Sequence, residues 1–293
     1  MEPEVSEPTR ATRRRPEEPQ PEVSEPTQAT RRRPEETKPE VRGPEVSDHE
    51  LAATIARRAG ELLLAIRDGF TGDDGDHALG DRGDRDANEL ILQALAEARP
   101  DDAVLSEESA DDPSRLTASR VWIVDPLDGT REYRERRTDW AVHVALAVDG
   151  VPVVGAVALP ALGLVLATDP APTVAPATDG PPRIIVSRTR DVPITEPLRA
   201  ALGAEVVPMG SAGAKAMAIV RGEADLYAHE GGQYQWDNCA PVAVALAAGL
   251  HASRLDGSPI VYNGTDTSLP DLLICRPELA DAALEVVHAR DAS

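Results

Sequence analysis

Aromatic residues, cysteine and basic charge are all scarce in this chain of 293 residues. Aromatic side chains make up 3% of it, too few for the stacking platforms that bind single-stranded nucleic acid. The 51 Asp and Glu residues outnumber the 30 Lys and Arg residues, which gives a formal net charge of −21. Because nucleic acid polymers and anionic membranes both require a basic surface, neither is expected as a partner. These absences predict a soluble, acidic, globular protein.

Segments that direct a protein into or across a membrane are also missing from the sequence. There is no run of about 18 apolar residues, so no membrane span is expected. The N-terminus begins with Glu, Pro and Arg rather than with an apolar stretch, and it does not predict a secretory signal. Cys239 and Cys275 form neither a disulfide framework nor a Cys-x-x-Cys motif. We therefore expect a protein of the reducing cytoplasm.

The first 46 residues differ in composition from the rest of the chain. Residues 3–20 read PEVSEPTRATRRRPEEPQ, and an almost identical copy follows at a spacing of 18 residues. This stretch holds nine of the 26 prolines and few large apolar residues, so it cannot offset the entropy of ordering and is expected to be disordered. Its two arginine triplets are interpreted as solvated charge. Residues 47–293 carry a net charge of −19 and are expected to form the folded part of the chain.

The first half of the folded part, about 47–168, begins with two predicted helices. A capping-box pattern and apolar residues at helical spacing predict a long helix up to Ile66. The acidic, glycine-rich stretch 68–83 is expected to be a loop, and a second helix is expected over about 85–98. Runs of β-forming residues then predict five strands at 104–105, 121–124, 140–148, 151–159 and 162–167.

A proline-rich stretch at 169–182 is expected to join this half to a second half, about 183–293. Strands are predicted there at 183–187, 205–209, 225–227 and 272–275. Helices are predicted at 196–202, 212–221, 239–250 and 277–288. A run of strands followed by alternating strands and helices predicts a layered α/β (α+β) fold.

The sharpest chemical signature is the segment 121–130, with the sequence VWIVDPLDGT. Its apolar residues predict a buried strand, and Asp125 and Asp128 follow where the strand ends. Gly129 allows the backbone to approach a ligand, and Thr130 begins a short helix whose free N–H groups suit a phosphate. Two rigid carboxylates beside an anion site predict Mg²⁺ binding for phosphate chemistry. A plain turn capped by an Asp side chain is the alternative.

Other polar residues lie at the ends of predicted elements. Glu107 and Glu108 follow a short apolar strand, with solvated loop acids as the alternative interpretation. Asp237 stands at the start of an apolar helix and Asp84 just before the second helix, so each is either a helix cap or a functional carboxylate. His143 lies among alanines in a predicted strand and is interpreted as a packed residue rather than a catalytic one.

Taken together and in this order, D…EE…DPLDGT…WD resembles the Mg²⁺-dependent, lithium-sensitive phosphatase superfamily of inositol monophosphatases. The segments LSEE, DPLDGTREY, GSAGAKAM and HASRLDGSP look most like its bacterial CysQ-type branch. The resemblance covers about residues 48–290. It implies a layered αβαβα sandwich and a cytoplasmic hydrolase of 3′-phosphoadenosine 5′-phosphate that serves sulfur assimilation, with two or three Mg²⁺ ions per site. A homodimer is compatible with the resemblance.

The resemblance also implies roles for individual residues. It assigns metal binding to the backbone carbonyl of Leu127 and to four carboxylates, those of Glu107, Asp125, Asp128 and Asp237. Glu108 would lie behind these ligands, and Asp84 with Thr130 would orient and deprotonate the attacking water. Substrate contacts would come from the segment 127–130, from the metal-binding acids Glu107 and Asp237, and from Ser211 and Lys215. The alternative is that the helix containing Lys215 has a purely structural role.

Two departures from the family pattern stand out. Cys239 occupies a position that normally holds a small residue after the WD motif. The usual Thr-x-x-Asp before the second helix is replaced by GDRGD at 80–84, which leaves the alignment of Asp84 open.

The substrate class has alternatives. Inositol-1-phosphate and fructose-1,6-bisphosphate are alternative substrates, because they carry the same kind of metal-bound phosphate group as the nucleotide. A non-catalytic regulator that binds metal or nucleotide would be favoured by a missing ligand carboxylate, but all of them are present. The negative charge of the protein opposes an anionic substrate, and bound Mg²⁺ would invert the local field where the acids converge.

Overall fold

A computed structural model describes residues 46–71, 75–177 and 179–291 of the chain. The repeats predicted to be disordered lie outside these residues, apart from Val46. The described residues form one compact unit. No helix within them combines the length and apolar character needed to cross a bilayer.

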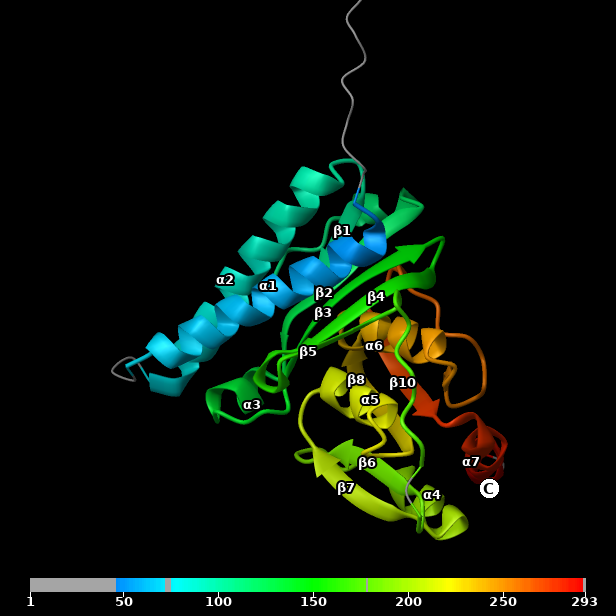
Figure 1. The fold of residues 1–293 in the computed structure, drawn as a ribbon. Helices are drawn as coiled ribbons and strands as arrows, with labels where there is room; N and C mark the ends of the chain where they lie inside the picture. Colours follow the sequence, from blue (N-terminus) through cyan, green and yellow to red (C-terminus); the bar gives the residue numbers. More distant parts are fainter. Residues whose placement is uncertain (1–45, 72–74, 178, 292–293) are drawn as a thin grey trace, which may run out of the picture. The chain divides into compact units, whose positions relative to one another are not determined.

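The first sheet is built by residues 103–167 and has the strand order β1-β2-β3-β4-β5. Its strands are β1 (Ala103–Ser106), β2 (Arg120–Asp128), β3 (Ala141–Val148), β4 (Val151–Leu159) and β5 (Leu164–Ala167). β1 and β2 pair in parallel, whereas all other neighbours are antiparallel. Helices α1 (Asp48–Gly69) and α2 (Gly75–Ala98) cover its outer face, as Figure 1 shows. Short helices η1 (Pro113–Thr117), α3 (Thr130–Arg134) and η2 (Pro160–Leu162) connect the strands.

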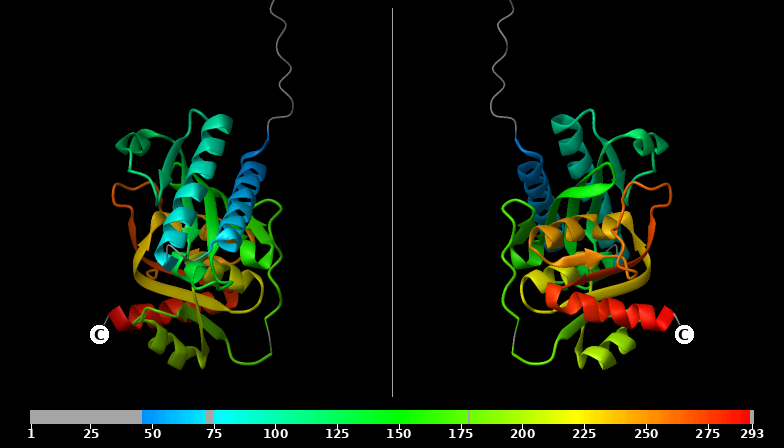
Figure 2. Two further views of the ribbon diagram at one scale, coloured as in Figure 1. Left: turned by 90° about the vertical axis from the view of Figure 1, so that its left-hand side faces the viewer. Right: turned by 90° about the vertical axis from the view of Figure 1, so that its right-hand side faces the viewer.

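The second sheet is built by residues 183–275 and has the order β7-β6-β8-β10-β9. Its strands are β6 (Arg183–Ser187), β7 (Glu205–Met209), β8 (Leu226–Tyr234), β9 (His251–Ser253) and β10 (Ser268–Cys275). Helices α5 (Ala212–Val220) and α6 (Gln235–Ala247) lie between the two sheets. Helices α4 (Thr195–Leu202) and α7 (Pro277–Asp291) cover the outer face of the second sheet (Figure 2).

Three apolar clusters hold these layers together. One joins α1 and α2 to the outer face of the first sheet through residues such as Trp122 and Val124. The central cluster packs α5 and α6 between the sheets, and its residues from β2, such as Ile123, alternate with those of the first cluster. The third cluster joins α4 and α7 to the second sheet. The predicted αβαβα sandwich is therefore confirmed.

The prediction of a loop over 68–83 was wrong for most of its length, because α2 begins at Gly75. Glycine weakens an isolated helix, but here two glycines face the neighbouring helix α3. A Cβ on Gly80 would lie 2.8 Å from the Thr130 side chain, and a Cβ on Gly83 would lie 3.1 Å from Tyr133. The glycines therefore allow α2 to pack closely against α3, and packing outweighs propensity.

Several further element boundaries differ from the prediction. β2 continues to Asp128 instead of ending at residue 124, so Asp125 and Asp128 lie within the strand and not beyond its end. β8 continues to Tyr234, and α6 begins at Gln235 rather than at residue 239. Pro241 therefore lies inside α6 instead of in its first turn. The short strand β9 was not predicted.

Candidate metal centre

Two neighbouring strands bring the first acidic residues to one edge of the first sheet. β1 and β2 run in parallel with Ser106 opposite Val124, so Glu107, just after β1, lies beside Asp125, the next residue of β2. The backbone N–H of Glu107 donates to the carbonyl of Val124 at 3.3 Å, which fixes the turn that follows β1. The two predicted strand-end motifs therefore converge.

A cluster of three carboxylates lies at this edge. Asp125, Asp128 and Asp237 each offer an oxygen atom, and these atoms all lie within 4.8 Å of one another. Asp237 comes from the first turn of α6, where its carboxylate also accepts the backbone N–H of Tyr234 at 2.5 Å. Asp237 is therefore a helix cap and a member of the cluster at once, so the two interpretations of this residue do not exclude each other.

Electrostatic repulsion within this cluster shifts the pKa values of its members. Burial, together with the charges of Glu107 and Asp128, raises the pKa of Asp125 well above its usual range. Glu107 lies beside these three carboxylates and is itself exposed. Desolvation by the surrounding protein and the charge of Asp237 raise its pKa to about 7. Burial and the charge of Asp128 raise the pKa of Asp237 to about 6. An all-oxygen donor set with such strong mutual repulsion fits a divalent cation such as Mg²⁺.

Asp128 differs from the other acids because donors surround its carboxylate. It accepts hydrogen bonds from Ser211 Oγ at 2.5 Å, from the backbone N–H of Ala212 at 3.1 Å and from that of Gly213 at 2.6 Å. Burial alone would raise its pKa, but the charge of nearby His143 and these hydrogen bonds lower it to about 2. The N-terminus of α5 therefore holds Asp128 in its ionised form.

His143 is a residue of the site that the sequence did not reveal. The prediction of a packed strand histidine is confirmed, since the side chain is fully buried in β3. Its Nδ1 lies 3.0 Å from the carbonyl oxygen of Trp236, and its Nε2 lies 3.2 Å from Asp128 Oδ2. His143 thus contacts a cluster carboxylate on one side and the start of α6 on the other. The only signal in the sequence was a lone polar side chain in an apolar strand.

Asp84 lies in the interior of α2, so its predicted position before the helix was wrong. The close packing of α2 on α3 places its Oδ1 3.4 Å from the hydroxyl of Thr130, which also lies 3.3 Å from the carbonyl oxygen of Leu127. Burial and the charges of Glu108 and Glu107 raise the pKa of Asp84 to about 8. The structure therefore brings together the two residues that the resemblance paired.

The turn that carries Glu107 and Glu108 is attached to α2 through Asn88. Asn88 Oδ1 accepts the hydroxyl of Ser106 at 2.7 Å, and its Nδ2 donates to Ser109 Oγ at 3.1 Å. Glu108 is exposed and contacts this turn rather than the carboxylate cluster. Glu108 is not among the three clustered carboxylates, and its assignment as a residue behind the ligands stays a prediction.

A pocket of about 280 Å³ opens beside the carboxylates, between α3, α5 and β8. Asp128, Asp237 and the segment Gly129–Thr130 line it, and Gly129 adopts a left-handed conformation (φ +92°) at the start of α3. Arg190 and Lys215 line it as well. The pocket therefore combines acidic and basic side chains.

Ser211 and Lys215 both line this pocket, and both also serve the structure of α5. The hydroxyl of Ser211 caps α5 by accepting the N–H of Ala214 at 3.0 Å while it donates to Asp128. The buried ammonium of Lys215 donates to the carbonyls of Gly210 and Ser211 at 2.6 and 2.7 Å. Burial lowers the pKa of Lys215 to about 8. The substrate contacts predicted for these two residues are thus compatible with their positions.

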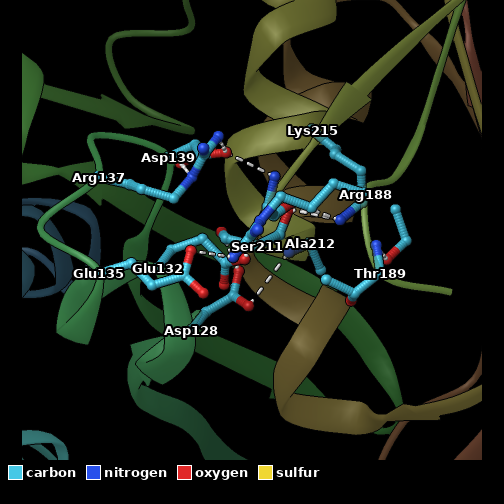
Figure 3. A network of polar contacts seen from close by, with 12 residues as sticks. Asp128, Glu132, Glu135, Arg137, Asp139, Arg188, Thr189, Ser211, Ala212 and Lys215 are labelled. Carbon is cyan, nitrogen blue, oxygen red and sulfur yellow. Dashed lines mark hydrogen bonds and ion pairs between the residues drawn. The ribbon is translucent and has the colours of Figure 1, made fainter. Parts of the chain in front are cut away.

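Ion pairs next to the pocket connect α3 to the second sheet, and Figure 3 shows them. Arg188 Nε lies 2.7 Å from Glu132 Oε1, and its Nη2 lies 2.5 Å from Glu135 Oε2. Asp139 accepts the backbone N–H of Gly210 at 2.7 Å. These contacts fix the loop that precedes α5, and therefore the donors that surround Asp128. Sequence reasoning missed them because they join residues more than 50 positions apart.

Comparison with known proteins agrees with this geometry. The sequence model of the inositol monophosphatase family matches residues 47–174 and 176–290. This protein belongs to the inositol monophosphatase family. The resemblance seen in the sequence is therefore confirmed, as is the predicted enzyme class, because this is a family of phosphomonoesterases.

Individual relatives point to one branch of the family. The chain is 52% identical to the 3′-phosphoadenosine 5′-phosphate phosphatase of Mycobacterium leprae over 257 residues, which cover 83% of this chain and 94% of that protein. It is 30% identical to the 3′(2′),5′-bisphosphate nucleotidase CysQ of Escherichia coli, over 73% of this chain and 94% of that protein. The crystal structure of CysQ from Bacteroides thetaiotaomicron superimposes with a TM-score of 0.68 at 27% identity, covering 79% of this chain and 97% of that one.

Proposed function

We propose that this protein is a Mg²⁺-dependent phosphomonoesterase that hydrolyses 3′-phosphoadenosine 5′-phosphate to AMP and phosphate. The pocket carries the proposal, because its lining combines carboxylates suited to metal ions with the cationic side chains of Arg190 and Lys215. A substrate with two separate phosphates matches such a pocket better than one with a single phosphate. The names of the relatives support the same substrate.

We assign the metal ions to the carboxylates of the cluster. Two or three Mg²⁺ ions would be held by five ligand groups, four of them carboxylates and one a backbone carbonyl: Glu107, Asp125, Asp128, Asp237 and Leu127. Bound Mg²⁺ lowers the pKa of a coordinated water and offsets the charge of the phosphate. The segment Leu127–Thr130 lies beside these carboxylates and would hold the phosphate that is cleaved.

Asp84 and Thr130 would handle the proton of the attacking water. The Thr130 hydroxyl can donate to Asp84 Oδ1, which leaves the Thr130 oxygen free to accept a hydrogen bond from the water. The proton of the water would pass to Thr130 as the proton of Thr130 passes to the Asp84 carboxylate. A base is most effective when its pKa lies near the working pH, and the environment of Asp84 raises its pKa to about 8. No side chain is assigned as a covalent nucleophile.

We extend the proposal to the setting of the enzyme. The resemblance to the CysQ-type branch supports a cytoplasmic role in sulfur assimilation, inhibition by lithium and a homodimeric assembly. A non-catalytic relative would be expected to lack one of the ligand carboxylates. The sequence contains all of them, and this disfavours the non-catalytic alternative.

A panel of phosphate-release assays tests the proposal. Each substrate is measured as kcat/KM with Mg²⁺ at neutral pH: 3′-phosphoadenosine 5′-phosphate, inositol-1-phosphate and fructose-1,6-bisphosphate. We expect the nucleotide to be preferred, because only its two phosphates are joined by a nucleoside that fills the pocket. A preference for either sugar phosphate would contradict the substrate but not the phosphomonoesterase activity. Lithium at millimolar concentration is expected to inhibit turnover of the preferred substrate.

A further inference from the structure

His229 is a buried polar side chain of the pocket with no role in the site described so far. It lies on β8, is 3% exposed and lines the pocket. Neither of its ring nitrogens has a hydrogen-bond partner among the residues that the structure describes. The carbonyl of Gly231 lies near the ring and acts to raise its pKa, but it makes no well-oriented hydrogen bond with either nitrogen. Because an unpaired buried donor is costly, this arrangement points to a ligand.

Two cations that line the pocket act on His229. Burial, together with the ammonium of Lys215 and the guanidinium of Arg190, lowers the pKa of His229 to about 4. At neutral pH the ring is therefore uncharged and offers one N–H donor and one acceptor nitrogen. Arg190 is fixed at the pocket wall because its Nη1 donates to the carbonyl of Gly232 at 2.6 Å.

His229 and the carboxylates Asp128 and Asp237 line the same pocket from different elements. The ring of His229 lies beside Tyr227, at 6.2 Å between ring centroids. The ammonium of Lys215 lies 5.2 Å from the centre of the Tyr227 ring. A ligand bound at the carboxylates can therefore reach His229 within this pocket through a second polar group.

We propose that His229 is a specificity-determining residue: its ring N–H donates to the second phosphate of the nucleotide, next to Arg190, while the phosphate to be cleaved lies at the carboxylate cluster. This inference rests on the proposed function, since it assumes a substrate with two phosphates. It predicts that His229 distinguishes 3′-phosphoadenosine 5′-phosphate from adenosine 3′-monophosphate, which lacks the distal phosphate. A role in packing against Tyr227 predicts no such discrimination.

The test measures kcat and KM for both nucleotides with the full-length protein and Mg²⁺. His229→Leu removes the donor and keeps an apolar side chain of similar reach, and the fold is expected to tolerate it because the ring nitrogens have no protein partner. We expect the KM for the bisphosphate to rise about 10- to 100-fold, the range for loss of one hydrogen bond to a charged group, with little change in kcat. The kcat/KM for the monophosphate is expected to stay within about twofold.

Two more variants complete the test. His229→Gln restores an N–H near the position of the ring nitrogens and is expected to recover part of the affinity for the bisphosphate. His288→Leu replaces an exposed histidine on α7 and serves as the matched control. Equal losses for both nucleotides in both His229 variants, or no loss for either, would overturn the inference while leaving the proposed function intact. Failure of the unmodified enzyme to turn over the bisphosphate would overturn the proposed function, and this inference with it.

Discussion

Two buried aspartates, one just before β8 and one near its other end, lie in opposite electrostatic environments. Asp225, just before β8, is 4% exposed and receives Arg276 Nε at 2.8 Å and the backbone N–H of Arg183 at 2.9 Å. Asp125, near the other end of β8, is 1% exposed and faces other carboxylates. Burial would raise the pKa of Asp225, but these donors lower it, whereas burial and neighbouring acids raise that of Asp125.

The difference between them separates a structural charge from a functional one. The protein supplies cationic partners for Asp225, so its burial is balanced within the chain. At the Asp125 cluster no Lys or Arg among the described residues forms an ion pair with the three carboxylates. A cation from solution is the partner that would balance their charges. Without it, the repulsion between the carboxylates lowers the free energy of unfolding.

The largest expected effect comes from removing one of the clustered charges. Asp125→Asn is expected to lower Mg²⁺-dependent kcat/KM by about 100-fold or more, because loss of a ligand exceeds the 10- to 100-fold effect of altering a group behind it. In metal-free buffer the same change is expected to raise the melting temperature, since a neutral amide replaces a buried carboxyl group whose ionised form is disfavoured by burial and by neighbouring acids. Phosphate release and thermal unfolding measure the two effects. Retained turnover would remove Asp125 from the metal site.

The opposite result is expected for the structural aspartate. Asp225→Ala leaves the buried guanidinium of Arg276 without its carboxylate and is expected to lower the free energy of unfolding by about 3–5 kcal/mol. Denaturant titration measures this loss. Activity per folded molecule is expected to stay near that of the unmodified protein, because Asp225 does not line the pocket. A stable variant with impaired turnover would contradict the comparison.

Substitution of His143 is expected to have an intermediate effect. His143→Gln loosens the contact with Asp128 Oδ2 and is expected to lower kcat/KM by about 10- to 100-fold, the usual result of altering a group that orients a metal ligand. A shift in the Mg²⁺ concentration required for half-maximal activity checks the mechanism. His49→Gln serves as a control, because His49 contacts Thr168 rather than the cluster. Identical Mg²⁺ dependence in both variants would exclude the orienting role.

The pH dependence of stability should also differ between the two regions. The raised pKa values of Glu107 (about 7) and Asp237 (about 6) mean that the folded protein binds extra protons above pH 4, so metal-free stability falls as the pH rises from about 5 to 8. The lowered pKa of Asp225 has the opposite sign, and its contribution is lost only as the pH falls below about 4. The stabilisation by Mg²⁺ is therefore expected to grow between pH 5 and 8. Thermal scans with Mg²⁺ or chelator measure this, and a constant difference would argue against the cluster.

The smallest effect is expected from the N-terminal repeats. Deletion of residues 1–46 is expected to change turnover per active site by less than about twofold, because the catalytic residues all lie in the compact unit that follows. Steady-state kinetics of the truncated and full-length chains provide the comparison. A large loss would show that the repeats contribute to the site.

Much of the carboxylate cluster was predictable because its residues lie in short motifs at or near strand ends. Asp125 and Asp128 share one short segment, and Glu107 follows a strand that pairs in parallel with β2, so local sequence indicated that these acids lie close together. The start of α2 was not predictable, because Gly80 and Gly83 lower helix propensity and only the packing against Thr130 and Tyr133 explains them.

The surroundings of the acids were less accessible to sequence reasoning. The contact between His143 and Asp128, like the pairing of Arg276 with Asp225, depends on where distant strands meet. Neither the raised pKa of Asp125 nor the lowered pKa of Asp225 has a local sequence signal, since both residues are single acids next to an apolar strand. Their different roles arise from which side chains the tertiary fold places within a few ångströms.

A Mg²⁺ titration at pH 8, with stability and turnover of 3′-phosphoadenosine 5′-phosphate measured in the same samples, tests the central claim most directly. We predict that the melting temperature and the rate of phosphate release rise together over one range of Mg²⁺ concentration. In Asp125→Asn the increase in melting temperature is expected to be much smaller and turnover to be lost. Full turnover in the presence of chelator, or Mg²⁺ stabilisation that is unchanged in Asp125→Asn, would contradict the account.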